Sequence, residues 1–359
     1  MAQPVNLAEL EALARERLPQ MVYDYYAGGA NDEITLNANR TAWEAVRLRP
    51  RVLVDVSHVD TSTTVLGRKL TMPLLTAPCG FNGLAHAGGE AAVARAAAAA
   101  GVVQVVSTVS TTSLEDVAAA APGGWRWFQL YCYRDREVTR SLVQRAEAAG
   151  YRAICVTADV PYLGRREREI RTGFHLPPGV TLKNLEPYAT AAELGAAERD
   201  SALRKYVNAL WDPSLDWSSI AWIRSLTTLP VVVKGILAGE DAVRALEHGA
   251  SGIIVSNHGG RQLDGAIPTA AALTEVVQAV GGRLEVLVDG GIRRGSHVVA
   301  ALAMGATAVL IGRPYLWGLA VGGEAGVREV LEAFRNEISL TMALCGRVNV
   351  AGLDARLVA

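Results

Sequence analysis

The sequence has neither a strong charge bias nor a long apolar segment. It carries 35 Lys and Arg residues against 36 Asp and Glu residues, which gives a formal net charge of −1. Proteins that bind nucleic acid usually present an excess of basic residues, so we expect no nucleic-acid partner. A membrane-spanning helix needs about 18 to 20 consecutive apolar residues, and the nearest approach, at 91–106, is interrupted by Arg95 and Gln104. Because the N-terminus also has no apolar leader, we expect a cytoplasmic protein without a membrane anchor.

Motifs for several chemistries are missing as well. The four cysteines (Cys79, Cys132, Cys155 and Cys345) form no CxxC pair, so we expect free thiols. The histidines form no HExxH pair and no carboxylate cluster accompanies them, so we expect no metal site. The GxSxG elbow of serine hydrolases is absent. No GxGxxG follows the first predicted strand, which argues against a dinucleotide fold.

What the chain does contain is a series of eight short apolar runs. Half of its residues are hydrophobic and 35 are glycine, a composition that suits a compact folded protein. Continuous apolar character without alternation is typical of parallel strands that are buried on both faces. We therefore predict strands within 69–80, 101–108, 126–133, 152–159, 230–236, 251–260, 284–291 and 307–314.

The spacing of these runs predicts the fold class. Helix-like stretches that end in glycine, such as GEDAVRALEHGA, lie between the runs, and most strand starts are roughly 20–35 residues apart. Eight β/α units of this size predict a closed (β/α)8 TIM barrel. A doubly wound sheet is the alternative, but it would usually begin with a glycine-rich turn.

The segments around the barrel are predicted to belong to one domain over 1–359. Residues 1–68 form an N-terminal helical extension packed on the barrel, 69–346 form the barrel, and 347–359 form a tail. The extension contains the amphipathic stretch LAELEALARERL, and apolar residues at helical spacing predict a closing helix late in the barrel. The gap of about 70 residues between the fourth and fifth runs predicts a lid loop around 175–215.

Polar side chains follow almost every predicted strand. Active sites of TIM barrels lie at the C-terminal ends of the strands, so these side chains should converge on one pocket. The polar residues at the strand ends are Ser107, Gln129, Tyr131, Thr157, Asp159, Lys234, Asp289 and Arg313.

His258 is the candidate general base. It stands in IIVSNHGGRQLDG, where Gly259 and Gly260 permit close approach of the backbone. A histidine alone could equally be a hydrogen-bonded core residue. Asp159, at another strand end, would orient the imidazole and stabilise its protonated form, with a helix N-cap as the alternative reading.

Cations near the same strand ends indicate two anion sites. Arg261 and Arg166 suit bidentate capture of a carboxylate, although Arg166 lies in GRRERE, which could also be a solvated loop. Lys234 would be costly to bury without an anion or an electron-rich ring beside it. DGGIRRG at 289–295 and IGRP at 311–314 follow the last two strands, where barrels commonly hold a phosphate, although tight turns are the alternative. These residues alone leave an isomerase, an aldolase and a flavin enzyme open.

The stretch SNHGGRQLDG resembles the signature of the FMN-dependent 2-hydroxy acid oxidoreductases, the family of glycolate oxidase, lactate oxidase, mandelate dehydrogenase and flavocytochrome b2. LPQMVYDYYAGGANDE, FQLYCYRDR, VTADVPYLGRRERE, VVVKGI, LVDGGIRRG and IGRP occur in the family's order. The resemblance implies FMN as cofactor, a small (S)-2-hydroxy acid as substrate and a homotetramer. The length of the lid segment resembles that of the soluble oxidases, which favours oxygen as acceptor and hydrogen peroxide as product. A soluble dehydrogenase that uses a quinone or a carrier protein is the alternative.

The resemblance also implies roles for single residues. His258 matches the catalytic base with Asp159 behind it, and Tyr131 lies near the substrate hydroxyl. Tyr25, which could otherwise pack on the barrel rim, joins Arg166 and Arg261 in binding the substrate carboxylate. The positions that match FMN contacts are Pro78, Cys79, Gly80, Ser107, Gln129, Thr157, Lys234, Ser256, Asp289, Gly291, Arg293, Gly312 and Arg313.

Two departures from the family pattern concern substrate size. Glycolate oxidase has a tryptophan in the stretch that matches STVSTTSLED, where this chain has Val109. Many members have alanine beneath the flavin, where this chain has Gly80. Both changes shrink side chains, so we predict that bulkier or aromatic 2-hydroxy acids are accepted in preference to glycolate.

Overall fold

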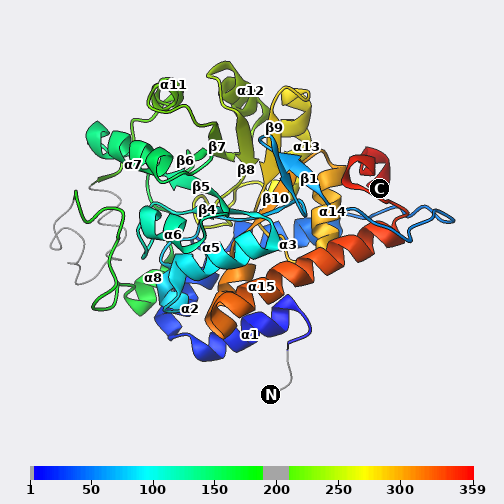
Figure 1. Cartoon of the computed structure of the whole chain (residues 1–359), viewed down its shortest axis with the longest axis horizontal. Coiled ribbons are helices and arrows are strands. Elements are labelled where there is room, and N and C mark those ends of the chain that lie inside the picture. The colour runs from blue at the N-terminus through cyan, green and yellow to red at the C-terminus, as the bar shows by residue number, and fades with distance from the viewer. Residues whose placement is uncertain (1–3, 189–209) are drawn as a thin grey trace.

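The computed structural model describes residues 4–188 and 210–359 and contains the predicted TIM barrel (Figure 1). Every neighbouring pair of barrel strands is parallel, and the sheet closes in the order β10-β3-β4-β5-β6-β7-β8-β9. The strands are β3 (Leu74–Thr76), β4 (Val103–Val106), β5 (Trp125–Leu130), β6 (Ile154–Thr157), β7 (Val231–Ile236), β8 (Gly252–Val255), β9 (Glu285–Val288) and β10 (Ala308–Ile311).

The first predicted strand was too long at its N-terminal side. Lys69 and Leu70 belong instead to a β-hairpin of β1 (Thr63–Val65) and β2 (Arg68–Leu70). The apolar run continues across the connection to β3, so its composition does not mark the boundary. Val65 and Leu70 join the side chains that fill the barrel, including Trp127, in one apolar cluster. The hairpin therefore covers the end of the barrel at which the strands begin.

Helices surround the barrel as the glycine-terminated stretches predict. Those described are α1 (Leu7–Arg17), α2 (Gln20–Ala27), α3 (Ile34–Ala45), α4 (Asn82–Ala85), α5 (Gly89–Ala100), α6 (Leu114–Ala120), α7 (Arg136–Ala148), α8 (Glu167–Thr172), α11 (Trp217–Ser225), α12 (Gly239–Glu247), α13 (Thr269–Val280), α14 (Gly295–Ala303) and α15 (Arg313–Leu344). Two 3-10 turns, η1 (Val350–Gly352) and η2 (Ala355–Leu357), follow.

The long helix α15 forms one side of the molecule, with α1 and α5 packed along it (Figure 1). It kinks at Gly322 and Gly323, where the backbone leaves the helical region. The predicted closing helix is its second half, and its apolar stripe is buried. The buried residues of this stripe are Val327, Val330, Leu331, Phe334 and Ile338.

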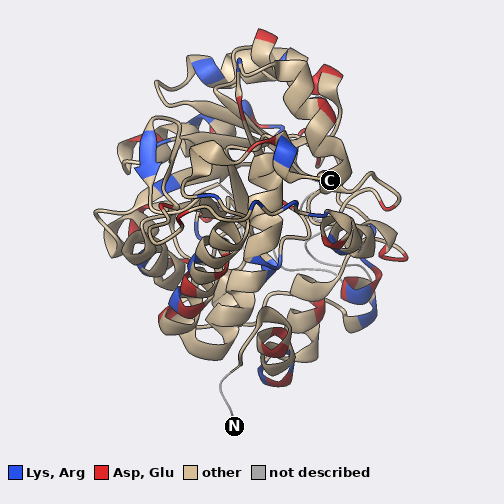
Figure 2. Cartoon of the chain, turned by 90° about the vertical axis from the view of Figure 1, so that its right-hand side faces the viewer, with Lys and Arg blue, Asp and Glu red and all other residues tan. Residues whose placement is uncertain are grey.

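The outer surface mixes charges of both signs. Figure 2 shows Lys and Arg interspersed with Asp and Glu along the helices. Some of these charges pair between elements, as in the 2.8 Å contact from Arg294 of α14's N-cap to Glu337 of α15. Within the part of the chain that the structure describes, no helix is both long and apolar enough to cross a membrane.

The N-terminal helices lie over the strand ends that carry the polar residues. Ala30, just after α2, donates its N–H to the carbonyl of Gly260 at 2.8 Å. Asn39 of α3 and Asn257 exchange two side-chain hydrogen bonds, each 2.8 Å long. The extension therefore holds the loop after β8 in place. The centre of the predicted lid, 189–209, lies outside the described residues.

Candidate active site

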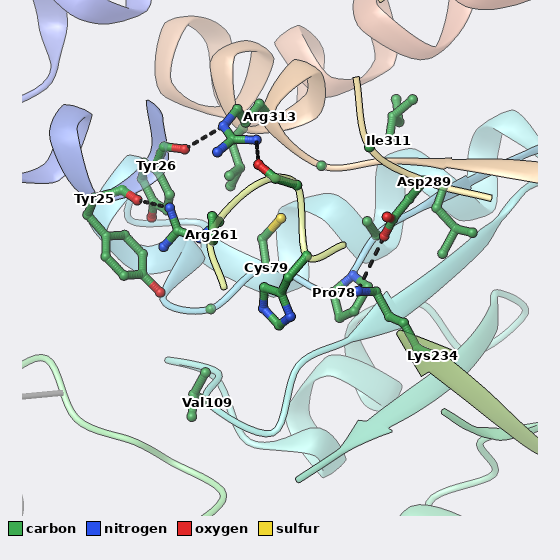
Figure 3. A pocket seen from close by; sticks show the side chains of 18 of the residues that line it. Tyr25, Tyr26, Pro78, Cys79, Val109, Lys234, Arg261, Asp289, Ile311 and Arg313 are labelled. Carbon is green, nitrogen blue, oxygen red and sulfur yellow. Dashed lines mark hydrogen bonds and ion pairs between the residues drawn. The ribbon is translucent and has the colours of Figure 1, made fainter. Parts of the chain in front are cut away.

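The C-terminal strand ends surround a cavity, the position at which TIM barrels hold their active sites. Figure 3 shows Tyr25 and Arg261 on one side of it and Asp289 and Lys234 on the other, with Cys79 between them. Fourteen of the residues expected in the site line this cavity: Tyr25, Pro78, Cys79, Gly80, Tyr131, Arg166, Lys234, His258, Arg261, Asp289, Gly291, Arg293, Gly312 and Arg313.

His258 and Asp159 form a hydrogen-bonded pair, 3.0 Å apart from Nδ1 to Oδ1. Burial raises the pKa of Asp159, but the charges of His258 and Lys234 outweigh burial and hold that pKa below its ordinary value. An ionised carboxylate can only accept, so the Nδ1 of the imidazole carries the hydrogen. Nε2 then has a free lone pair, which is what a general base requires.

The pKa of His258 is set by opposing effects. Burial lowers the pKa, Asp159 raises it, and the charge of Lys234 lowers it again. The balance lies below the ordinary value, so the imidazole is neutral and able to accept a proton at neutral pH.

The loop after β8 adopts an unusual backbone in order to present this imidazole. His258 has φ of 58°, and the two glycines that follow have φ of 64° and 75°. A left-handed conformation costs free energy for a residue with a side chain, and strained residues cluster at active sites. Gly260 cannot be replaced by a residue with a side chain, because a Cβ there would lie 2.5 Å from the backbone nitrogen of Leu36.

Arg166 and Arg261 lie side by side, and Arg261 is tied to the N-terminal extension. Arg166 Nε donates to the carbonyl of Arg261 at 3.2 Å, and Arg261 Nη1 donates to the carbonyls of Tyr25 and Gly28 at 2.5 and 3.0 Å. Arg261 also lies over the ring of Tyr25, 5.0 Å from its centroid. The solvated-loop reading of GRRERE is therefore wrong for Arg166, which is buried.

Tyr131 lines the cavity beyond the end of β5 and stacks on Trp211 with ring centroids 3.8 Å apart. Burial raises the pKa of Tyr131 to about 12, so its hydroxyl keeps its hydrogen at neutral pH. Trp211 is held by main-chain hydrogen bonds on both sides, from Arg134 to Leu210 at 2.9 Å and from Asp212 to Cys132 at 3.0 Å. Residues 210–212 are thus fixed beside Tyr131.

Lys234 links β7 to the ends of β8 and β9. Its ammonium donates to Ser256 Oγ at 2.8 Å and lies 3.4 Å from Asp289 Oδ2. Burial lowers the pKa of Lys234, but the carboxylates of Asp289 and Asp159 outweigh burial and raise it above the ordinary value. The side chain therefore remains a cation at the wall of the cavity.

The remaining expected residues stand behind the wall of the cavity. Gln129 accepts a hydrogen bond from the Ser107 hydroxyl at 3.2 Å and donates one to the Thr157 hydroxyl at 3.0 Å. The pairing of β6 with β7 sets Thr157 level with Lys234. These polar groups, with Ser256, support the cavity without lining it.

Arg293 and Arg313 form a second cationic group in the cavity. Arg313 donates to the carbonyls of Tyr26, Gly259 and Gly28 at 2.8, 3.1 and 2.9 Å. Among residues 4–188 and 210–359, neither guanidinium forms an ion pair with a carboxylate. Burial lowers the pKa of Arg293 to about 10 and that of Arg313 to about 9.

Comparison with known proteins identifies the family. The family model described as FMN-dependent dehydrogenase matches residues 14–359. The chain belongs to this family. It is 52% identical over 357 residues to L-lactate oxidase of Nostoc sp. (strain PCC 7120), covering 99% of this chain and 98% of that protein. It is 51% identical over 343 residues to glycolate oxidase of Spinacia oleracea, covering 95% and 92%.

A solved structure is also similar. A crystal structure of mandelate oxidase with (S)-4-hydroxymandelic acid matches with a TM-score of 0.94 and 48% identity, covering 99% of this chain and 98% of that one. The expected membership of the FMN-dependent 2-hydroxy acid oxidoreductases is confirmed. FMN is the family's cofactor, and oxidation of a 2-hydroxy acid is the reaction class.

The cavity fits FMN by its unpaired polar groups. Arg293 Nε and Asp289 Oδ1 are buried without a hydrogen-bond partner among the described residues, and such groups are costly unless a ligand completes them. A phosphate would pair with the guanidiniums of Arg293 and Arg313, and a ribityl hydroxyl would donate to Asp289.

The sequence analysis did not single out Glu169 or Trp211 as site residues. Glu169 contacts both Arg166 and Arg261, and Trp211 lines the cavity. Glu169 belongs to a run of alternating charges, and Trp211 stands near the end of the long segment after β6. Neither position shows a local pattern that distinguishes it, because both act through contacts with residues far away in the chain.

Proposed function

We propose that this enzyme oxidises an (S)-2-hydroxy acid to the 2-oxo acid, with oxygen as acceptor and hydrogen peroxide as product. The observation that supports it most directly is the His258–Asp159 pair in one cavity with two arginines and Lys234. Arg166 and Arg261 bind the carboxylate, and the hydroxyls of Tyr25 and Tyr131 lie beside the same space.

His258 holds the proton that the reaction releases. The substrate loses two electrons and two protons. His258 Nε2 accepts one of these protons, from the hydroxyl or from C2, and the other passes with the two electrons to the acceptor, as a hydride or separately. The Asp159 carboxylate stabilises the imidazolium that results. FMN, when bound, supplies the two-electron acceptor. Lys234 holds a positive charge at the cavity wall, where negative charge on the cofactor would be stabilised.

Oxygen is the favoured acceptor because the relatives at about half identity over nearly their full length are named oxidases. An anaerobic titration of the FMN-loaded enzyme with (S)-2-hydroxy acids, followed by admission of air, tests the proposal. Bleaching followed by fast recolouring with peroxide is expected. Slow recolouring would indicate the dehydrogenase alternative. Absence of bleaching by every acid would contradict the roles of His258 and the arginines.

The substrate is proposed to carry a bulky or aromatic side chain. Val109 lines the cavity, and a Cβ on Gly80 would lie 2.8 Å from Val109 Cγ2 and 3.0 Å from the Tyr25 hydroxyl. The absent side chain of Gly80 thus gives room to Val109 and to the Tyr25 hydroxyl, and the space offered to a substrate side chain depends on the small size of Val109. Turnover with glycolate, lactate, 2-hydroxyoctanoate and mandelate tests this, and a strong preference for glycolate would contradict it.

The organisation of the protein is proposed to be one domain over 1–359, assembled as a cytoplasmic homotetramer. Exposed apolar side chains support subunit contacts, with Val52 82% and Leu53 103% exposed. Light scattering coupled to size-exclusion chromatography would measure the assembly, and a monomer would contradict it. Cell fractionation would test the location.

A further inference from the structure

Glu169 is a buried carboxylate that both substrate-binding arginines share. It lies on α8 with 2% of its surface exposed. Its Oε1 is 3.3 Å from Arg166 Nη1 and 3.2 Å from Arg261 Nη2. A buried charge needs partners of opposite sign, and here one oxygen serves two guanidiniums from segments 95 residues apart.

The presence of Glu169 changes the net charge that a substrate meets. Arg166 and Arg261 contribute two positive charges, and Glu169 removes one. Lys234 is paired with Asp289 at 3.4 Å. Asp159 is hydrogen-bonded to His258 at 3.0 Å, but the imidazole is neutral, so Asp159 contributes a further negative charge. The charges of these six charged groups therefore sum to zero, so a single carboxylate can bind through the two guanidiniums but no surplus positive charge remains for a second one.

We propose that Glu169 determines specificity by restricting the site to 2-hydroxy acids that carry one negative charge. An anion with a second carboxylate beside the first would meet the Glu169 charge without a free cation to offset it. Coulombic interactions over a few ångströms are strong in a buried site, so the discrimination does not need a steric clash. The inference rests on the proposed function, because it assumes that Arg166 and Arg261 hold the substrate.

Glu169 also positions the two guanidiniums. Each gives one N–H to Glu169, while Arg166 Nε and Arg261 Nη1 bind main-chain carbonyls. The carboxylate therefore sets the distance between the two side chains. A change that keeps the charge but shortens the side chain should weaken the binding of every carboxylate without changing the preference for monoanions.

The experiment compares Glu169→Gln with Glu167→Gln in the FMN-loaded enzyme. Glu167 lies on the same helix but is 34% exposed and pairs with Arg165 and Arg171 at the surface. Binding of oxalate, a dianion, and of pyruvate, a monoanion, is measured by calorimetry. Glu169→Gln should raise the oxalate-to-pyruvate affinity ratio by about tenfold, equivalent to about 1.4 kcal/mol. Glu167→Gln should leave the ratio unchanged.

Glu169→Asp separates charge from geometry. The ratio should stay within about twofold of the wild-type value while both affinities fall. An unchanged ratio in Glu169→Gln, or an Asp variant whose ratio rises about tenfold, would overturn the proposal. Failure of the proposed function has a different signature: both anions would bind with these ratios, yet no 2-hydroxy acid would bleach the wild-type enzyme.

Discussion

Two pairs of arginines line the same cavity, and the protein treats them differently. Arg166 and Arg261 share the carboxylate of Glu169. Arg293 and Arg313 form no ion pair with any carboxylate in the described ranges, and burial lowers the pKa of both. The first pair is thus partly neutralised by the protein itself, whereas the second keeps its full charge.

The difference fits the two ligands proposed for these pairs, a cofactor phosphate and a substrate carboxylate. A cofactor phosphate carries up to two charges and remains bound through many turnovers, so an unneutralised pair of cations suits it. A substrate carboxylate carries one charge and must leave as product after each cycle. Product would leave slowly from two full guanidinium charges in a buried site. With Arg166 and Arg261 in their proposed role, Glu169 would reconcile binding of the carboxylate with its release.

The largest expected effect is on the rate of the reaction, and it comes from a substitution that leaves both arginine pairs unchanged. His258→Asn should lower kcat by between about 10² and 10⁴, because a positioned base is lost. FMN content and oxalate affinity should remain, since neither arginine pair is altered. Stopped-flow measurement of flavin reduction checks the rate, with His58→Asn, at an exposed position, as control. Retained flavin reduction would contradict the role of His258.

The unneutralised pair can be broken at Arg293. Arg293→Met should weaken FMN binding by about 10- to 100-fold, the usual contribution of a hydrogen bond to a charged group. Arg294→Met is the matched control, because its side chain is 47% exposed and pairs with Glu337. Fluorescence titration of the apoenzyme with FMN measures both. Equal affinities in the two variants would mean that the second pair does not hold the phosphate.

The part of the cavity beside Val109 can be narrowed without changing either pair of arginines. Val109→Trp should lower kcat/KM for mandelate relative to glycolate by about tenfold or more, because the ring fills space beside Gly80. Val109→Leu should give an intermediate ratio. Steady-state kinetics on both acids measure the change. A ratio that does not follow side-chain size would show that Val109 does not limit the substrate.

The sequence predicted the barrel and most of the cavity because both depend on local patterns. Parallel strands read as continuous apolar runs, and polar residues such as Lys234 and Asp289 stand at their ends. The β1–β2 hairpin was missed because Lys69 and Leu70 merge into the next apolar run. Glu169 was missed for a different reason. Its burial depends on Arg261, which is 92 residues away, and its own neighbours resemble a solvated charged loop.

The smallest expected effect is a shift in the pH dependence of kcat/KM. It concerns His258, the base near Arg166 and Arg261. Asp159 raises the pKa of His258, whereas burial and Lys234 lower it. Asp159→Asn removes the raising contribution, so the pKa of His258 should fall further below its ordinary value. Because the base acts when neutral, activity is lost as pH falls through that pKa, and the acid limb of kcat/KM should move to lower pH. Asp55→Asn, at an exposed position, should leave the limb in place. A limb that moves to higher pH in Asp159→Asn would mean that His258 is not the group whose ionisation controls the rate.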